Sequence, residues 1–225
     1  MVLKEGKKIL INAQTAVAKH VTEIMNGKKF SYKTFGQEIE SYVSESMEKV
    51  FRQAGQKSVK RAENKNAFPD LAVVFSDGTL AIDFKTGNHY KKKRGNWVSC
   101  NNSNNDLGTI KSWPGKIKKF GGENIFFVFV EYSINDSIHK LETVTIDVFY
   151  KFLDVNMNGV LKYRKKDGNL RPKNFNAPSK IKSFEEFNKL FEQTSILRAK
   201  SLISEHLETI PKKDRNSFLD SLKTD

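Results

Sequence analysis

The sequence predicts an α/β fold in which a central mixed β-sheet is flanked by helices. Two segments with helical spacing of apolar residues come first, strongly apolar strand-like runs follow, and another helical segment closes the chain. Helices that precede and follow a set of strands are expected to cover the faces of the sheet that those strands form. No internal repeat and no clear linker divides the chain, so we expect one domain over residues 1–225.

The first two elements are expected to be helices. Apolar side chains recur every three or four residues over 8–25 and again over 35–51, which places them on one face of each helix. Gly27 and Gly55 follow these segments and are typical stop signals. The polar face of the second helix carries four glutamates, which are Glu38, Glu40, Glu45 and Glu48.

The middle of the chain changes to strand-like patterns. Residues 71–75 form a short apolar run, 76–78 have turn chemistry, and 79–85 have the pattern of a returning strand, so we expect a β-hairpin. Residues 124–132 are the most apolar strand-like segment and are expected at the centre of the sheet, because a strand buried on both faces lacks polar alternation. Residues 144–149 are expected to add another strand.

Two further segments separate these strands. Residues 86–108 contain almost no apolar side chains, so we expect a long polar loop there. Such loops in compact domains are usually functional or disordered. Residues 111–120 predict a helix with a break at 114–115, where proline and glycine interrupt the pattern.

The C-terminal third of the chain combines a basic segment with a helix. Residues 162–182 are rich in Lys and Arg and are expected to form an exposed loop or ribbon. Ser183 and Glu186 have the spacing of a capping box, which predicts a helix that continues to about Ile210.

Charge is the strongest feature of the composition. The 225 residues include 39 Lys and Arg against 26 Asp and Glu, a net charge of +13, and such a field attracts polyanions. No apolar run approaches the roughly 18 residues of a membrane span, and no secretory signal is expected at the start of the chain. Cys100 is the one cysteine, so no disulfide within the chain is expected. These features predict a cytoplasmic protein without membrane contact.

Several kinds of cofactor chemistry are not indicated. The four histidines lie far apart in the sequence and do not have the spacing of metal ligands. A single cysteine excludes zinc sites built from several thiolates. No glycine-rich loop of the Walker type is present, so we expect no use of ATP.

Two acids and a lysine near the predicted hairpin are the strongest candidate for chemistry. Pro69 and Asp70 stand at the entry to the first strand, and Asp83, Phe84 and Lys85 lie on the returning strand. Side chains two apart in a strand share a face, and the hairpin brings Asp70 opposite Asp83. Two carboxylates and the carbonyl of Phe84 are hard oxygen ligands of the kind that Mg²⁺ prefers.

Such an arrangement suits hydrolysis of a phosphodiester. A divalent ion activates water and screens the charge of the phosphate, and an adjacent ammonium can stabilise the transition state. Lys85 could orient the nucleophile or neutralise charge, and with a lowered pKa it could also act as a base. The sequence leaves these roles of Lys85 open.

These residues resemble the motif of the PD-(D/E)XK nuclease superfamily. Asp70, followed by Asp83 and Lys85 on a predicted hairpin, with an acidic helix upstream, carries the resemblance. Within that superfamily the chain looks like a type II restriction endonuclease, most nearly of the EcoRV and HincII branch. The resemblance covers residues 34–132 as catalytic core, and leaves about 160–225 as a basic DNA-binding loop and a helical C-terminal part.

The resemblance implies further properties. A glutamate on the first core helix of this family assists metal or water binding, and the matching position is Glu38, with Glu45 as the weaker candidate. It also implies Mg²⁺-dependent cleavage of double-stranded DNA at a specific palindromic site, with 5′-phosphate and 3′-hydroxyl products. A two-fold site and one metal centre per strand predict a homodimer.

Basic and amide side chains are candidates for DNA contacts. Lys and Arg neutralise phosphates, whereas Asn matches the hydrogen-bonding edge of adenine. The DNA-binding candidates are Lys91, Lys92, Lys93, Arg94, Asn96, Asn101, Asn102, Asn104, Asn105, Lys111, Arg171 and Lys173. Other basic residues that are candidates for phosphate contacts are Lys116, Lys118, Lys119, Arg164, Lys165 and Lys166.

Two alternatives remain at this stage. A structure-selective nuclease, such as a Holliday-junction resolvase, would share the core but read the shape of DNA. A nucleic-acid-binding module without catalysis would use the acidic pair structurally. Metal-dependent nicking of plasmid DNA that Asp83→Ala abolishes would separate an enzyme from a binding module.

Overall fold

The computed structural model describes residues 2–31, 34–64, 67–101, 103, 105–135 and 138–221. The α-helices are α1 (Val2–Asn12), α2 (Gln14–Gly27), α3 (Phe35–Gln53), α4 (Trp113–Phe120), α5 (Phe184–Thr209) and α6 (Arg215–Ser221). The strands are β1 (Val59–Arg61), β2 (Leu71–Phe75), β3 (Gly78–Asn88), β4 (Tyr90–Lys93), β5 (Asn96–Ser99), β6 (Ile125–Asn135) and β7 (Ile138–Val148). Short 3₁₀ helices are η1 (Gly122–Asn124), η2 (Phe149–Phe152) and η3 (Lys212–Asp214).

A mixed five-stranded sheet forms the centre of the molecule, which confirms the predicted fold class. Its strand order is β1-β2-β3-β6-β7, with β3 and β6 parallel and every other pair antiparallel. The apolar strand β6 lies inside the sheet, between β3 and β7, as its pattern indicates. The prediction that it occupies the centre is off by one strand, because β3 holds the middle place.

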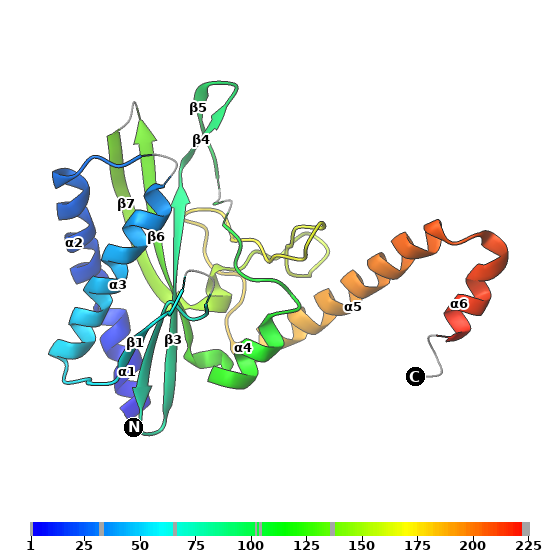
Figure 1. The fold of residues 1–225 in the computed structure, drawn as a ribbon, viewed down its shortest axis with the longest axis horizontal. Coiled ribbons are helices and arrows are strands. Elements are labelled where there is room, and N and C mark those ends of the chain that lie inside the picture. Colours follow the sequence, from blue (N-terminus) through cyan, green and yellow to red (C-terminus); the bar gives the residue numbers. More distant parts are fainter. Residues whose placement is uncertain are drawn as a thin grey trace.

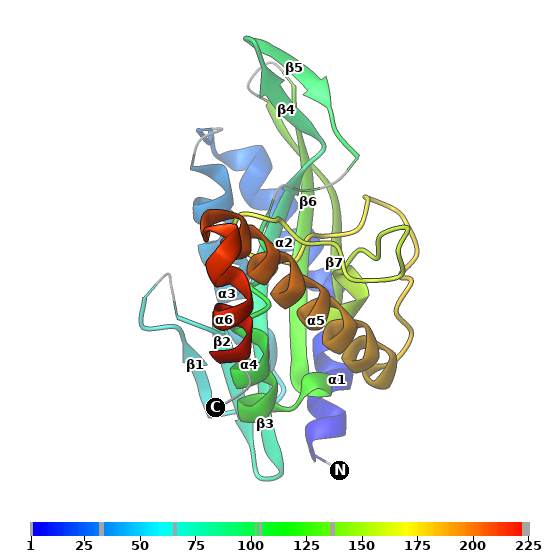
Figure 2. The ribbon, with the colours of Figure 1, turned by 90° about the vertical axis from the view of Figure 1, so that its right-hand side faces the viewer.

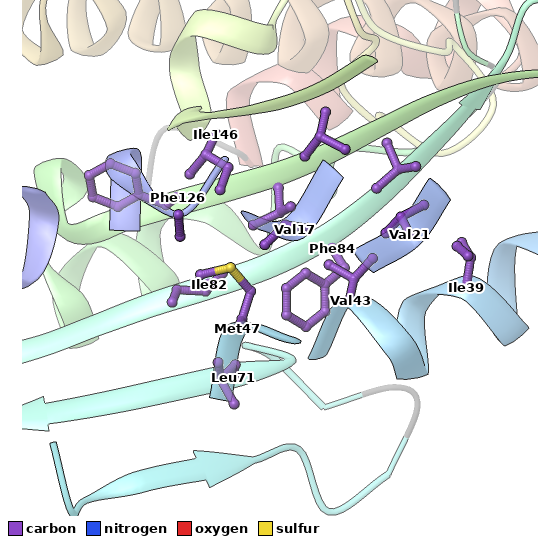
Figure 3. Close-up of a cluster of buried hydrophobic side chains, with 14 of the residues drawn as sticks. Val17, Val21, Ile39, Val43, Met47, Leu71, Ile82, Phe84, Phe126 and Ile146 are labelled. Atoms are coloured by element: carbon purple, nitrogen blue, oxygen red, sulfur yellow. The ribbon is translucent and has the colours of Figure 1, made fainter. Parts of the chain in front are cut away.

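Helices cover both faces of this sheet. Helices α1 to α3 lie on one face, and α4 with the beginning of α5 lies on the other (Figure 1). Strand β6 serves both layers: Phe126 and Val128 belong to the core beneath α2 and α3, and Phe127 and Phe129 to the core beneath α4 and α5. Figure 3 shows the first of these cores, where Met47 of α3 packs among side chains of the sheet.

Two predicted helices differ in detail from the structure. The predicted helix over 8–25 is two helices, because the chain tightens at Ala13, whose N–H bonds both Ile9 O at 3.0 Å and Leu10 O at 3.2 Å. The expected break at 114–115 does not occur. Helix α4 begins at Trp113, so Pro114 lies in the first turn, where its missing N–H leaves no bond unmade.

The predicted long loop over 86–108 is largely strand. Strand β3 continues to Asn88, and β4 and β5 form a two-stranded hairpin that projects beyond the main sheet (Figures 1 and 2). Lys93 pairs with Asn96, which leaves Arg94 and Gly95 as a two-residue turn with φ values of 50° and 87°. Positive φ at both positions is typical of the hairpin turn whose twist matches that of its strands.

The basic segment over 162–182 is an irregular ribbon, as expected. Isolated bridges such as Tyr163 with Leu170 hold it, and Leu161, Leu170 and Ile181 are buried in the core beneath α4 and α5. The ribbon therefore covers that core with its apolar side chains while most of its basic side chains remain outside.

The C-terminal helix begins at the predicted capping box. Ser183 Oγ accepts a hydrogen bond from the Glu186 N–H at 3.1 Å, and the Glu186 carboxylate accepts one from the Lys182 N–H at 2.7 Å. Helix α5 extends away from the sheet, and α6 follows after a turn (Figure 1). None of the helices in the described part of the chain combines the length and apolar character that crossing a lipid bilayer requires.

Candidate active site at the free edge of strand β3

The candidate site forms where β3 loses its antiparallel neighbour. Pairing between β2 and β3 ends at Leu71 and Ile82, so no strand of the described residues lies beside the next peptide groups of β3 on that side. Asp70 takes the place of a strand: its Oδ2 accepts a hydrogen bond from the Phe84 N–H at 2.6 Å. The Asp70 carbonyl accepts one from the Ala62 N–H at 2.9 Å, which fixes the position of this residue.

The structure brings the three predicted side chains together. Lys85 Nζ lies 2.5 Å from Asp83 Oδ2 and donates to the Phe84 carbonyl at 3.1 Å. The side chains of Asp83 and Asp70 line the same cavity. Asp70 and Asp83 therefore converge on one side of the sheet, which the proposed metal chemistry requires.

The glutamate that faces this site is Glu40 and not the expected Glu38. Glu38 accepts a hydrogen bond from Thr34 Oγ1 at 2.6 Å and lies 3.6 Å from Lys28 Nζ. Residues two apart on a helix point about 200° away from each other. Glu40 accordingly lies on the opposite side of α3 and lines the same cavity as Asp83.

The weaker candidate, Glu45, also lies elsewhere. It borders a surface hollow together with Glu48 and Arg52, farther along α3. The sequence contains the periodicity of α3, but it does not show how the helix is rotated about its axis against the sheet.

A polar cavity of about 240 Å³ surrounds the converging side chains. Strand β3, helix α3 and helix α4 all contribute to its walls. Its lining residues are Glu40, Ala67, Phe68, Asp70, Asp83, Phe84, Lys85, Asp106, Gly108 and Lys116.

The acids of the cavity repel one another and are partly withdrawn from water. Burial raises the pKa of Asp70 to about 7, and the neighbouring Asp83 carboxylate adds to this effect. Burial also raises the pKa of Glu40. For Lys85, burial by itself lowers the pKa, but the carboxylates of Asp83, Asp70 and Glu40 outweigh it, so the pKa is raised. Lys85 is therefore an ammonium at neutral pH when no metal is bound.

The oxygen atoms of the site fit a cation. The Lys85 ammonium already lies between Asp83 Oδ2 and the Phe84 carbonyl, two of the oxygens expected to hold Mg²⁺. Among the described residues no group of three or more His, Cys, Asp or Glu is arranged as a complete metal centre. Two carboxylates and a carbonyl suit Mg²⁺ nonetheless, because this ion keeps several of its waters.

Several predicted DNA-binding residues are exposed on the projecting hairpin. Lys91, Lys93, Arg94 and Asn96 have exposed side chains on β4, β5 and the turn between them. Lys111 is exposed before α4. The side chain of Lys92, and all of Asn102 and Asn104, lie outside the described residues.

Three other candidates make internal contacts instead. Asn105 Nδ2 donates to the Thr86 carbonyl and so fastens the segment after β5 to β3. Arg171 pairs with Asp106 at 2.8 Å, and its side chain is only 17% exposed. Lys173 donates to the Ala177 carbonyl. These contacts hold the three side chains within the ribbon or the sheet in the free protein, and their part in DNA binding stays a prediction.

Asn101 belongs to a second polar cavity, of about 290 Å³, at the base of the β4–β5 hairpin. Asn174 and Asn176 join it there from the basic ribbon, and the Phe175 N–H holds the two segments together by donating to the Asn101 carbonyl at 2.7 Å. Sequence reasoning did not single out Asn174 or Asn176, because only the tertiary structure places them beside Asn101.

Comparisons with known proteins identify the fold. No protein-family model matches the chain, and no curated protein matches its sequence. Among the 52 chains of solved structures that match, one is titled "NlaIV restriction endonuclease". It aligns with a TM-score of 0.53 and 11% sequence identity, over 73% of this chain and 65% of that chain, which is just under two thirds of its length. The similarity shows a restriction-endonuclease-like fold, and it does not single out the EcoRV and HincII branch.

Proposed function

We propose that this protein is a Mg²⁺-dependent type II restriction endonuclease that cleaves double-stranded DNA at a specific palindromic site. The observation that carries the proposal is the convergence of Asp70, Asp83 and Lys85 on the free edge of β3. The fold shared with a restriction endonuclease supports it, as does the net charge of +13. We expect 5′-phosphate and 3′-hydroxyl ends, action as a homodimer in the cytoplasm, and no requirement for ATP.

Asp70, Asp83 and the Phe84 carbonyl would hold the metal ion, and Glu40 would act from α3 in the place expected for Glu38. When bound, Mg²⁺ supplies activation of water and neutralisation of phosphate charge. Lys85 stays charged beside Asp83, so its role is to stabilise negative charge in the transition state. The raised pKa of Lys85 favours electrostatic stabilisation over the alternative in which Lys85 is the general base.

The projecting hairpin and the neighbouring amides would bind the DNA. Lys91, Lys93 and Arg94 are exposed cations suited to phosphate contacts. Asn101 and Asn174 share a cavity whose lining, among the described residues, includes amides but no Lys or Arg, which suits the neutral hydrogen-bonding edges of bases better than phosphates. We therefore propose that these amides read the DNA sequence, and that the hairpin binds the DNA backbone through its positive charges.

Digestion of a phage DNA of known sequence tests the proposal. With Mg²⁺ we expect discrete fragments, and with EDTA intact DNA. Sequencing of the fragment ends gives the site, and ligation by an enzyme that needs a 5′-phosphate tests the end chemistry. Asp83→Asn should abolish cleavage, whereas Asp147→Asn, which removes a partly exposed carboxylate of β7 that does not line the cavity, should not. Intact DNA with every divalent metal tried would refute the proposal, and cleavage only of branched DNA would favour the resolvase alternative.

A further inference from the structure

A second lysine lines the cavity from helix α4. Lys116 lies on α4, one turn after Trp113, and lines the same cavity as Asp83 and Lys85. The start of α4 is firmly held: the Trp113 indole donates to the Leu107 carbonyl at 3.0 Å, and its ring stacks on Phe149 with centroids 4.1 Å apart. Lys116 therefore projects from a rigid support.

The surroundings of Lys116 position its ammonium without neutralising it. Its Nζ lies 3.8 Å from the centroid of the Phe68 ring and 5.0 Å from that of Trp113, at cation–π distances. Within the part of the chain that the structure describes, no carboxylate lies within ion-pair distance of this Nζ, whereas Lys85 has Asp83 at 2.5 Å.

Space for this ammonium depends on a glycine. Gly108 has φ +90°, and a Cβ there would lie 3.3 Å from Lys116 Nζ and 3.0 Å from Trp113 Nε1. The positive φ favours glycine, and the absent side chain leaves room for the lysine at the cavity wall.

A half-buried ammonium without a paired anion is an unfavourable arrangement in the free protein. Aromatic rings offset only part of the loss of hydration. An anion that entered the cavity would meet both Lys85 of β3 and Lys116 of α4. The chemistry that completes this pair of cations is a phosphate group.

We propose that Lys116 is a catalytic residue, which binds a non-bridging oxygen of the phosphodiester that is cut. This inference rests on the proposed nuclease function and adds a second cation to the one on Lys85. The two differ in their surroundings: Lys85 is paired with Asp83 in the free protein, and Lys116 is held ready by aromatic rings. Lys116 would therefore contact the substrate both before and during cleavage.

The test compares Lys116 with a lysine outside the candidate DNA-binding residues. Lys19 is exposed on α2 and does not line the cavity. Lys116→Met keeps most of the length of the side chain and its apolar contact with Phe68, Lys116→Arg keeps the charge, and Lys19→Met is the control. We would measure single-turnover cleavage of mapped phage DNA with Mg²⁺, the salt dependence of DNA binding in EDTA, and the midpoint of thermal unfolding.

We expect Lys116→Met to slow cleavage by about 100-fold, the usual effect of removing one donor to a developing charge. It should also reduce the slope of log affinity against log salt by about 0.9, because one phosphate is no longer neutralised. Lys116→Arg should recover a large part of the rate, and Lys19→Met should match the wild type in both measurements.

Three results would overturn the inference. The first is cleavage by Lys116→Met as fast as by Lys19→Met, and the second is cleavage by Lys116→Arg as slow as by Lys116→Met. The third is a rate that falls together with the unfolding midpoint while the salt slope stays unchanged. If the wild type does not cleave DNA, the proposed nuclease function fails, and the salt slope still decides whether Lys116 contacts a phosphate. If the wild type cleaves and Lys116→Met is equally fast, only the Lys116 assignment fails.

Discussion

The backbone N–H and carbonyl of Phe84 show how much of the site depends on one unpaired strand edge. Its N–H donates to Asp70 Oδ2 at 2.6 Å, and its carbonyl accepts from Lys85 Nζ at 3.1 Å. Because β2 does not pair beyond Leu71, side chains satisfy the polar groups that a strand would otherwise satisfy. The hydrogen bonds that satisfy the backbone of Phe84 therefore also fix the positions of Asp70 and Lys85 in the candidate site.

The rotation of α3 leads to a prediction about its glutamates. Glu40→Gln should reduce cleavage by about 10- to 100-fold, the range found when groups that support metal ligands are replaced. Glu38→Gln should leave cleavage near the wild-type rate, because Glu38 contacts Thr34 and Lys28 outside the cavity. Steady-state cleavage, with thermal unfolding of both variants as a control for folding, checks this. A slower Glu38 variant would restore the assignment expected from the family resemblance.

The raised pKa of Asp70 predicts how stability depends on pH when divalent ions are removed. The pKa rises from 3.8 to about 7 on folding, so between these values the native state keeps a proton that the unfolded state has released. The free energy of unfolding in EDTA should therefore decrease as pH rises from about 4 to about 7, by at most about 4 kcal/mol.

Urea unfolding in EDTA at several pH values checks this expectation. Asp70→Asn removes the titrating group and should flatten the profile between the two pKa values. Identical profiles for the variant and the wild type would show that Asp70 does not titrate in this window.

At the scale of elements, the β4–β5 hairpin is defined by a local turn. Arg94 and Gly95 both have positive φ, and Lys93 pairs directly with Asn96. A two-residue turn of this kind sets the register of its strands without help from the core, so a polar hairpin can project from the sheet. An arm of this kind can present basic side chains to a groove or backbone of DNA.

The hairpin should carry much of the electrostatic binding. Replacing Lys91, Lys93 and Arg94 together by Gln should lower the slope of log affinity against log salt by about 0.9 for each phosphate that the arm no longer neutralises. A triple Gln variant of the exposed lysines on the α1 and α2 layer, which are Lys4, Lys8 and Lys19, is the control. Fluorescence anisotropy with a DNA duplex measures both slopes, and equal slopes for the two variants would contradict an arm that binds DNA.

At the scale of the whole molecule, α5 has apolar residues on two different faces. Its first half buries Phe187 in the core beneath α4, whereas farther along the helix Ile196 and Ile203 are 50% and 40% exposed. Successive residues of a helix are about 100° apart, so these isoleucines point away from the face that Phe187 uses. A nuclease that cuts both strands of a two-fold site needs a second copy, and this face offers it an apolar contact.

We expect the proposed homodimer to bury this face of α5. Replacing Ile196 and Ile203 together by Ser should shift the protein from dimer to monomer with little change in thermal unfolding, because neither side chain belongs to the core. Lys200→Ser, an exposed change on the same helix, is the control. Light scattering after size exclusion gives the mass, and an unaltered dimer would place the interface elsewhere on the molecule.

The sequence by itself determined the order of most elements and the three central residues of the candidate site, which are Asp70, Asp83 and Lys85. Apolar periodicity located α3, β2 and β6, and the capping box located the start of α5. Asp83 and Lys85 share a face because alternation in a strand is a local property, and Asp70 opposes Asp83 because a short hairpin sets its own register. The β4–β5 hairpin was missed because its strands are polar and lack an apolar face.

Only the tertiary structure decided which other side chains line the cavity with these three residues and which are bound by residues elsewhere. Glu40 rather than Glu38 faces the cavity because packing on the sheet sets the rotation of α3. Arg171 is bound by Asp106, 65 positions away, and Lys116 reaches the cavity only because α4 packs beside β3. Spacing along the chain determines what lies on one face of an element, whereas contacts between distant elements depend on how those faces pack together.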